Sequence, residues 1–237
     1  MRRSLASLTI AVAASLVAPL AHADIFFSSG PYNGTIDGWG IFDSGGVDSA
    51  PKSDNFILPG AGIVDSVTFD VWAAPGTTMQ TVSWAILSGG PDASAGGTVI
   101  ASGNAAPVTQ NTLLPGASQL YGYDIDSETV AVPDVAIGQA GTYWLELSHG
   151  NDASGDSFFW DENDNPNNIP GLTAWDGVLG YLDPSNPAAF ANGCTGSVPC
   201  TETFSVGGTA APEPGGLGLE GAMLLGMAVF IKRKIAR

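Results

Sequence analysis

Apolar and polar residues alternate along much of the chain between residues 24 and 211. Segments 63–72, 81–87 and 141–149 each contain a set of apolar residues at every second position, such as Val67, Phe69 and Val71 in the first. This period of two puts one set of side chains on the buried face of a β-sheet. Weaker strands are predicted at 53–58, 98–102, 119–125, 157–160, 178–182 and 201–206. No window in this span has the periodicity of an amphipathic helix.

Proline and glycine mark the turns between these strands, as in the Pro-Gly pairs at 59–60, 75–76 and 115–116. Proline fixes φ, and glycine supplies the positive φ that many turns require. Many short strands separated by such turns predict an all-β fold. We expect one antiparallel β-sandwich, jelly-roll-like, over residues 24–206, followed by a Gly/Ala linker at 207–211.

The N-terminal residues 1–23 have the composition of a secretory signal peptide. They begin with Arg2 and Arg3, continue through an apolar stretch and end in Ala21-His22-Ala23. This order predicts a signal helix that signal peptidase removes before Asp24. A first transmembrane helix is the alternative, but the apolar stretch is short and leads directly into a good cleavage site.

The C-terminal residues 212–237 combine three features in a fixed order. Pro212-Glu213-Pro214 comes first, an apolar segment at 217–231 follows, and Lys232-Arg233-Lys234 ends it. As a helix, the apolar segment would be roughly 22 Å long, against a hydrocarbon core of about 30 Å. This length suits a transient membrane helix, and the basic cluster would stay cytoplasmic while residues 24–206 lie outside.

These three features resemble the PEP-CTERM sorting signal of Gram-negative bacteria. The resemblance implies that an exosortase recognises the tail in the inner membrane and that the protein then reaches the cell surface or the exopolysaccharide matrix. Glu220 inside the apolar segment and Gly215-Gly216 depart from the family's pattern. An ordinary single-pass anchor is the alternative. The body of the chain is also similar to that of many such proteins, with its Gly-Thr-Tyr-Trp-Leu strand at 141–145.

The charge of the chain is strongly acidic, with 7 Lys and Arg against 23 Asp and Glu and a net charge of −16. Two of these acids, Glu213 and Glu220, lie outside the span from Asp24 to Ala211. That span therefore holds 21 acids against one cation, Lys52, for a net charge of −20. Such a surface cannot neutralise phosphates, which excludes nucleic acid as a partner.

Catalytic motifs are scarce in the acidic span. His149 is its one histidine, it contains no arginine, and no nucleophile motif surrounds a serine. Glu146 is the best single acid, and no spacing pairs it with Glu128, Glu162 or Glu202. We therefore expect a protein that is not an enzyme. A secreted polysaccharide hydrolase with an Asp/Glu pair is the alternative.

Calcium is the most plausible cofactor, because hard oxygen donors are concentrated after residue 150. Asp161, Asn163 and Asn165 match the first three ligand positions of a calcium loop. Pro166 then stands where glycine is needed, and Leu172 stands where the bidentate glutamate belongs. A polar, hydrated loop without a metal is the alternative.

Four tryptophans suggest contact with a glycan: Trp72, Trp144, Trp160 and Trp175. Trp72 and Trp144 fall out of phase with the apolar set of their strands, and the other two flank the Asp/Asn-rich segment. A flat ring outside the core can stack on a sugar. The alternative is that these rings are buried in a second small core. A bound glycan should be neutral, or anionic only through a calcium bridge.

Cys194 and Cys200 are the only cysteines. Export places them in an oxidising compartment, so we expect a disulfide worth roughly 2 kcal/mol. Together these features predict an exported surface or matrix protein with a structural or carbohydrate-binding role that is linked to exopolysaccharide.

Overall fold

The computed structural model describes residues 24–32, 38–41, 51–116, 122–153, 155–163, 172, 174–176, 180–181 and 201–211. This part of the chain is nearly all β, as the sequence predicts. The expected signal helix, the C-terminal segment 212–237, Asn165, Cys194 and Cys200 lie outside the described residues. No helix among the described residues is long and apolar enough to cross a membrane.

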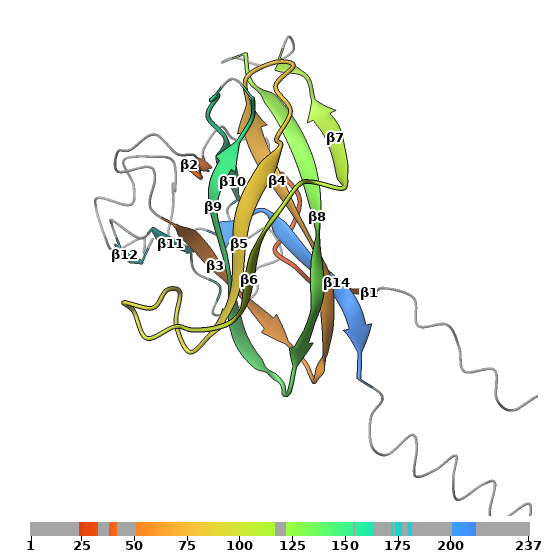
Figure 1. The fold of residues 1–237 in the computed structure, drawn as a ribbon, viewed down its shortest axis with the longest axis vertical. Helices are drawn as coiled ribbons and strands as arrows, with labels where there is room; N and C mark the ends of the chain where they lie inside the picture. The colour runs from red at the N-terminus through yellow and green to blue at the C-terminus, as the bar shows by residue number, and fades with distance from the viewer. Residues whose placement is uncertain are drawn as a thin grey trace, which may run out of the picture.

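The described residues form short antiparallel strands that belong to two sheets (Figure 1). Their bounds are β1 Asp24–Ser28, β2 Gly38–Gly40, β3 Lys52–Leu58, β4 Gly62–Ala73, β5 Thr81–Ser88, β6 Thr98–Ala105, β7 Thr109–Leu114, β8 Asp124–Ile137, β9 Gly141–Asn151, β10 Phe159–Asn163, β11 Ala174–Asp176, β12 Gly180–Tyr181, β13 Thr201–Glu202 and β14 Phe204–Ala210.

The eight-stranded sheet is organised around β4. Strand β8 pairs with one edge of β4 and carries β7 on its far side, while β14 and β10 share the other edge of β4. Strand β1 pairs with β14, and β2 and β13 pair with β10. The six-stranded sheet has the order β12-β11-β3-β9-β5-β6.

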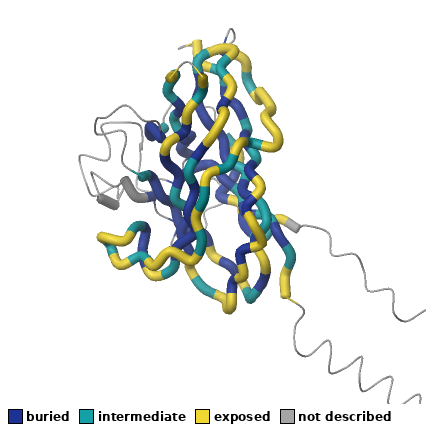
Figure 2. The backbone as a smooth tube through the Cα atoms, viewed as in Figure 1, coloured by how far each residue is buried: buried dark blue, intermediate teal, exposed yellow. Residues whose placement is uncertain are grey.

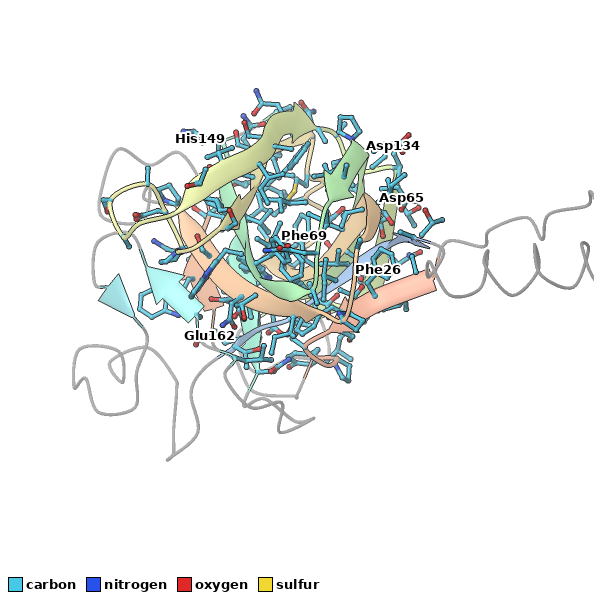
Figure 3. All side chains as sticks on the ribbon, turned by 90° about the horizontal axis from the view of Figure 1, so that it is seen from below. Phe26, Asp65, Phe69, Asp134, His149 and Glu162 are labelled. Atoms are coloured by element: carbon cyan, nitrogen blue, oxygen red, sulfur yellow. The ribbon has the colours of Figure 1, made fainter. Side chains whose placement is uncertain are left out.

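The core lies between the two sheets and contains side chains from both. Phe69 of β4, Phe56 of β3 and Leu145 of β9 are fully buried in it, and Trp160 of β10 packs edge-on against Phe69. The tube in Figure 2 is dark blue along these inner strands. In Figure 3 Phe69 points into the interior, whereas Asp65 and Asp134 lie at the periphery. Burial of these apolar side chains is the main source of stability of the folded sandwich.

The predicted alternation is confirmed in the three strongest segments, which become β4, β5 and β9. Of the strand predicted at 119–125, residues 119–121 lie outside the described part of the chain, and only Asp124 and Ile125 belong to a strand, β8, which continues to Ile137. Its inner positions include Asp126 and Glu128, which interrupt the apolar alternation that marks a strand. The segment predicted at 201–206 is divided into β13, which pairs with β10, and β14, which pairs with β4.

Candidate functional site

A row of hydroxyl side chains crosses five strands on the outer face of the eight-stranded sheet. In register, Ser28 of β1 lies beside Ser205 of β14, which lies beside Thr68 of β4. The row continues to Thr129 of β8 and Thr109 of β7. Because paired strands lie about 4.8 Å apart, the hydroxyl groups repeat at about that interval. The hydroxyls of Thr68 and Thr129 are hydrogen-bonded at 2.9 Å.

Asp70 lies two residues further along β4, on the same outer face. Ser127 is its partner in register on β8, and Asn111 of β7 follows. Burial raises the pKa of Asp70, while hydrogen bonds from the Ser127 hydroxyl and the Tyr32 backbone N–H oppose this shift. The carboxyl group therefore sits among hydrogen-bond donors, in a position to orient a polar ligand.

A cleft of about 210 Å³ opens beside Asp70 and is accessible to solvent. Gly30 and Pro31 form one wall, as the chain leaves β1 and passes over the sheet. The polar lining consists of Ser28, Thr68, Asp70, Thr203 and Ser205. Hydroxyl groups both donate and accept hydrogen bonds, so this lining matches the chemistry of a sugar ring.

A cluster of aromatic rings borders the hydroxyl row. Trp72 packs edge-on against Tyr32 at 5.9 Å and against Tyr123 at 6.4 Å between ring centroids. Tyr123 contacts Phe159 in the same way at 6.2 Å. Trp72 itself is only 3% exposed, whereas Tyr123 is 36% exposed. Tyr123 is therefore the most exposed ring of this cluster, and Trp72 packs against it.

Three of the four tryptophans proposed for glycan contact are buried, which corrects that expectation. Trp72 is covered by the aromatic cluster, and Trp160 belongs to the main core. Trp144 packs with Ala85 and Leu87 in a second small core, as the alternative reading held. Trp175 lies in β11 opposite Ser53, and its side chain is not described. Large rings gain more from burial than from exposure on an outer face.

The two described members of the proposed calcium loop lie in strand β10 rather than in a loop. Asp161 is fully buried, and its two oxygens accept hydrogen bonds from Trp72 Nε1 and Thr203 Oγ1, both at 2.6 Å. Asn163 is buried and donates to Thr203 Oγ1 at 3.4 Å. Both side chains already serve the fold. Among the described residues, no group of three or more His, Cys, Asp or Glu is placed to hold a metal.

The structure pairs two glutamates that the sequence left apart. Glu162 of β10 and Glu202 of β13 are direct partners in register and are each 1% exposed. Asp54 of β3 reaches across the core and accepts a hydrogen bond from the Glu202 backbone N–H at 2.5 Å. Burial raises the pKa of Asp54 well above its usual value. We call Lys52, Asp54, Glu162 and Glu202 the buried charge cluster.

Trp39 connects the charged groups of this cluster. Its indole N–H donates to a Glu162 carboxylate oxygen, and the Lys52 ammonium lies 5.9 Å from the centre of its ring. Lys52 is 1% exposed, so the single cation of the acidic span is inside the sandwich. An acid pair with so little exposure cannot meet a polysaccharide chain, which argues against Glu162 and Glu202 as hydrolase residues.

Two other glutamates differ in their environment. Glu146 is half-buried on the outer face of β9, where burial and Asp92 raise its pKa while His149 lowers it. Glu128 of β8 faces the interior, and one of its oxygens accepts a hydrogen bond from Gln110 Nε2 at 3.0 Å. Burial and the neighbouring Asp126 raise the pKa of Glu128 to about 8. Neither glutamate lines the cleft beside Asp70.

The chain matches no protein-family model, and no curated protein matches it. The site therefore has to be judged on its own geometry. The sequence indicated the polar phase of each strand, such as Thr68 and Asp70 in β4. It did not indicate that hydroxyl residues from five strands would align, because register between distant strands is not visible in a single sequence.

Proposed function

We propose that this is an exported, non-enzymatic surface or matrix protein that binds neutral polysaccharide on the outer face of its eight-stranded sheet. The observation that carries the proposal is the hydroxyl row beside the open cleft at Asp70. Serine and threonine hydroxyls can exchange hydrogen bonds with sugar hydroxyls, and the exposed face of Tyr123 offers a surface for stacking. The net charge of −16 favours neutral over anionic glycans.

The jelly-roll arrangement expected for the sandwich is part of this proposal. It is supported by the repeated crossing of the chain between sheets, as from β3 to β4 and back to β5. Jelly-roll sandwiches include lectin domains, which bind carbohydrate. The hydrolase alternative is disfavoured, because the glutamate pair that lies in register among the described residues, Glu162 and Glu202, is buried.

Binding is tested by affinity electrophoresis of the purified chain in gels that contain dextran, galactomannan or soluble β-glucan, with polygalacturonate as an anionic comparison. We expect retardation by at least one neutral polymer, with and without chelator. Tyr123→Ala removes the accessible ring and should weaken binding about fivefold, given about 1 kcal/mol for such a contact. Asp70→Asn should weaken it as well.

The matched control is Ile57→Ala, which removes a side chain of similar exposure, 39%, from the six-stranded sheet. It should leave retardation unchanged. Equal retardation of the wild type and Tyr123→Ala would exclude the proposed face, and no retardation by any of the polymers would exclude polysaccharide binding altogether.

Delivery to the surface follows from the two ends of the chain, and we propose the route of PEP-CTERM proteins. Signal peptidase would remove residues 1–23, and an exosortase would act on the tail that begins at Pro212. Mass spectrometry of the exported protein in cells with and without the exosortase tests this route. We expect residues 232–237 to be absent from the wild-type product alone, and their presence in both strains would refute the proposal.

A further inference from the structure

One long stretch of the chain carries no charge. From Ala93 to Tyr123 there is no Asp, Glu, Lys, Arg or His, although the whole chain has a net charge of −16. This stretch contains β6 and β7, together with residues 106–108 that connect them. We call β6, β7 and this connection the neutral flank.

Both strands of the neutral flank are edge strands. Within the described part of the chain, β6 pairs only with β5, at the end of the six-stranded sheet, and β7 pairs only with β8. Strand β6 also contacts β8 of the other sheet (Figure 1). Among the described residues, β6 and β7 therefore each have one edge that pairs with no other strand.

The neutral flank is also unusually apolar for an exposed surface. Four large hydrophobic side chains are exposed there, and they are Val99 at 50%, Ile100 at 39%, Val108 at 65% and Leu113 at 50%. Figure 2 shows the tube mostly yellow along this flank. Natural edge strands are commonly protected by lysine, by proline or by inward charges. Strand β6, with the sequence TVIASGNA, has no such residue, and its pairing with β5 is irregular only between Ile86 and Leu87, which face Ala101 and Val99.

The distribution of charge indicates which partner fits this flank. Two copies of so acidic a chain repel each other over most of their surfaces, because carboxylates of one face carboxylates of the other. A contact through the neutral flank brings together strands that carry no carboxylates of their own. The same flank offers apolar side chains and open backbone groups, which supply the attraction.

We propose that the neutral flank is the contact surface of a homodimer in which β6 pairs antiparallel with β6 of a second copy. An antiparallel β6–β6 pair has two-fold symmetry, so both subunits use the same strand. The assembly therefore closes at two subunits and does not grow into a fibre. It joins the two six-stranded sheets into one continuous sheet. The cleft beside Asp70 lies on the outer face of the other sheet and takes no part in the contact, so the dimer does not depend on glycan binding.

Sedimentation of the purified chain over a range of concentrations and salt tests the dimer. We expect self-association that strengthens from about 50 mM to about 500 mM salt, because salt screens the repulsion between acidic subunits. Ile100→Lys places a charge on β6 and should weaken association by about tenfold or more. Ile63→Lys is the matched control, since Ile63 is 40% exposed but lies on the central strand β4, and it should associate like the wild type.

Hydrogen exchange in the wild type gives a second measurement that needs no variant. The amides of Thr98–Ala105 should exchange more slowly as the protein concentration rises, while those of β1 should not change. A monomer at every concentration and salt would overturn the proposal. So would equal weakening by the two lysine substitutions, or protection that develops on β1 instead of β6.

Discussion

Glu128→Gln is expected to stabilise the folded protein at pH 8 by on the order of 4 kcal/mol and to have almost no effect at pH 4. Glu128 keeps its proton in the folded state up to a pKa of about 8, whereas the unfolded chain loses it near its usual value of 4.5. Between these two values the folded state binds more protons, so stability falls as pH rises. At about 1.4 kcal/mol per pKa unit, the accumulated loss has the stated size.

Glutamine imitates the protonated form and cannot ionise, so the variant avoids this loss. Urea denaturation at pH 4, 6 and 8 measures the free energy of unfolding of both proteins, and the difference between them should widen as the pH rises. Asp134→Asn, on the exposed part of the same strand, is the control and should follow the wild type. Parallel pH curves for wild type and Glu128→Gln would show that Glu128 is not held in its protonated form. Burial also raises the pKa values of Asp54 and Asp126, so these two groups should make the stability of both proteins fall with rising pH in the same way.

Lys52→Met is expected to destabilise the protein by about 3 to 5 kcal/mol at pH 7. The ammonium group lies inside the sandwich on the same side of β3 as Asp54, and it stacks against the Trp39 ring that also binds Glu162. Removing one member of a buried ionic group leaves the others without compensation in a medium that solvates charge poorly. Thermal or urea denaturation of the variant measures the loss.

The pH dependence of this loss separates charge from packing. At pH 4 more of the neighbouring carboxyl groups are neutral, so the cost of Lys52→Met should shrink. The double variant Lys52→Met/Glu202→Gln should recover part of the loss at pH 7, because it also removes one of the carboxylates left behind. A loss that is below about 1 kcal/mol, or that is the same at both pH values, would contradict an electrostatic role for Lys52.

The sequence predicted the fold class well, because strands such as β4 and β9 place a set of apolar residues on the core face at every second position, as with Val67, Phe69 and Val71. It failed where acids face inward. Asp126 and Glu128 occupy inward-facing positions of β8, so the apolar alternation that would have identified this strand is interrupted there. The charge pattern also did not indicate that Lys52 would be buried. The prediction that tryptophans contact a glycan failed for a related reason. Trp144 is out of phase with the apolar residues of its strand, but it is buried in a second small core. Only the three-dimensional register assembles Ser28, Ser205 and Thr68 into one row.

The position of Lys52 has a consequence for how the protein resists proteolysis. A protease that cleaves after lysine or arginine finds a single target between Asp24 and Ala211, and that target lies in β3 between β9 and β11. The peptide bond there is reached only when the sandwich opens, because cleavage requires local unfolding. Folding alone thus protects the acidic span from trypsin-like proteases. Cleavage after Lys52 would therefore indicate that the sheet has unfolded locally.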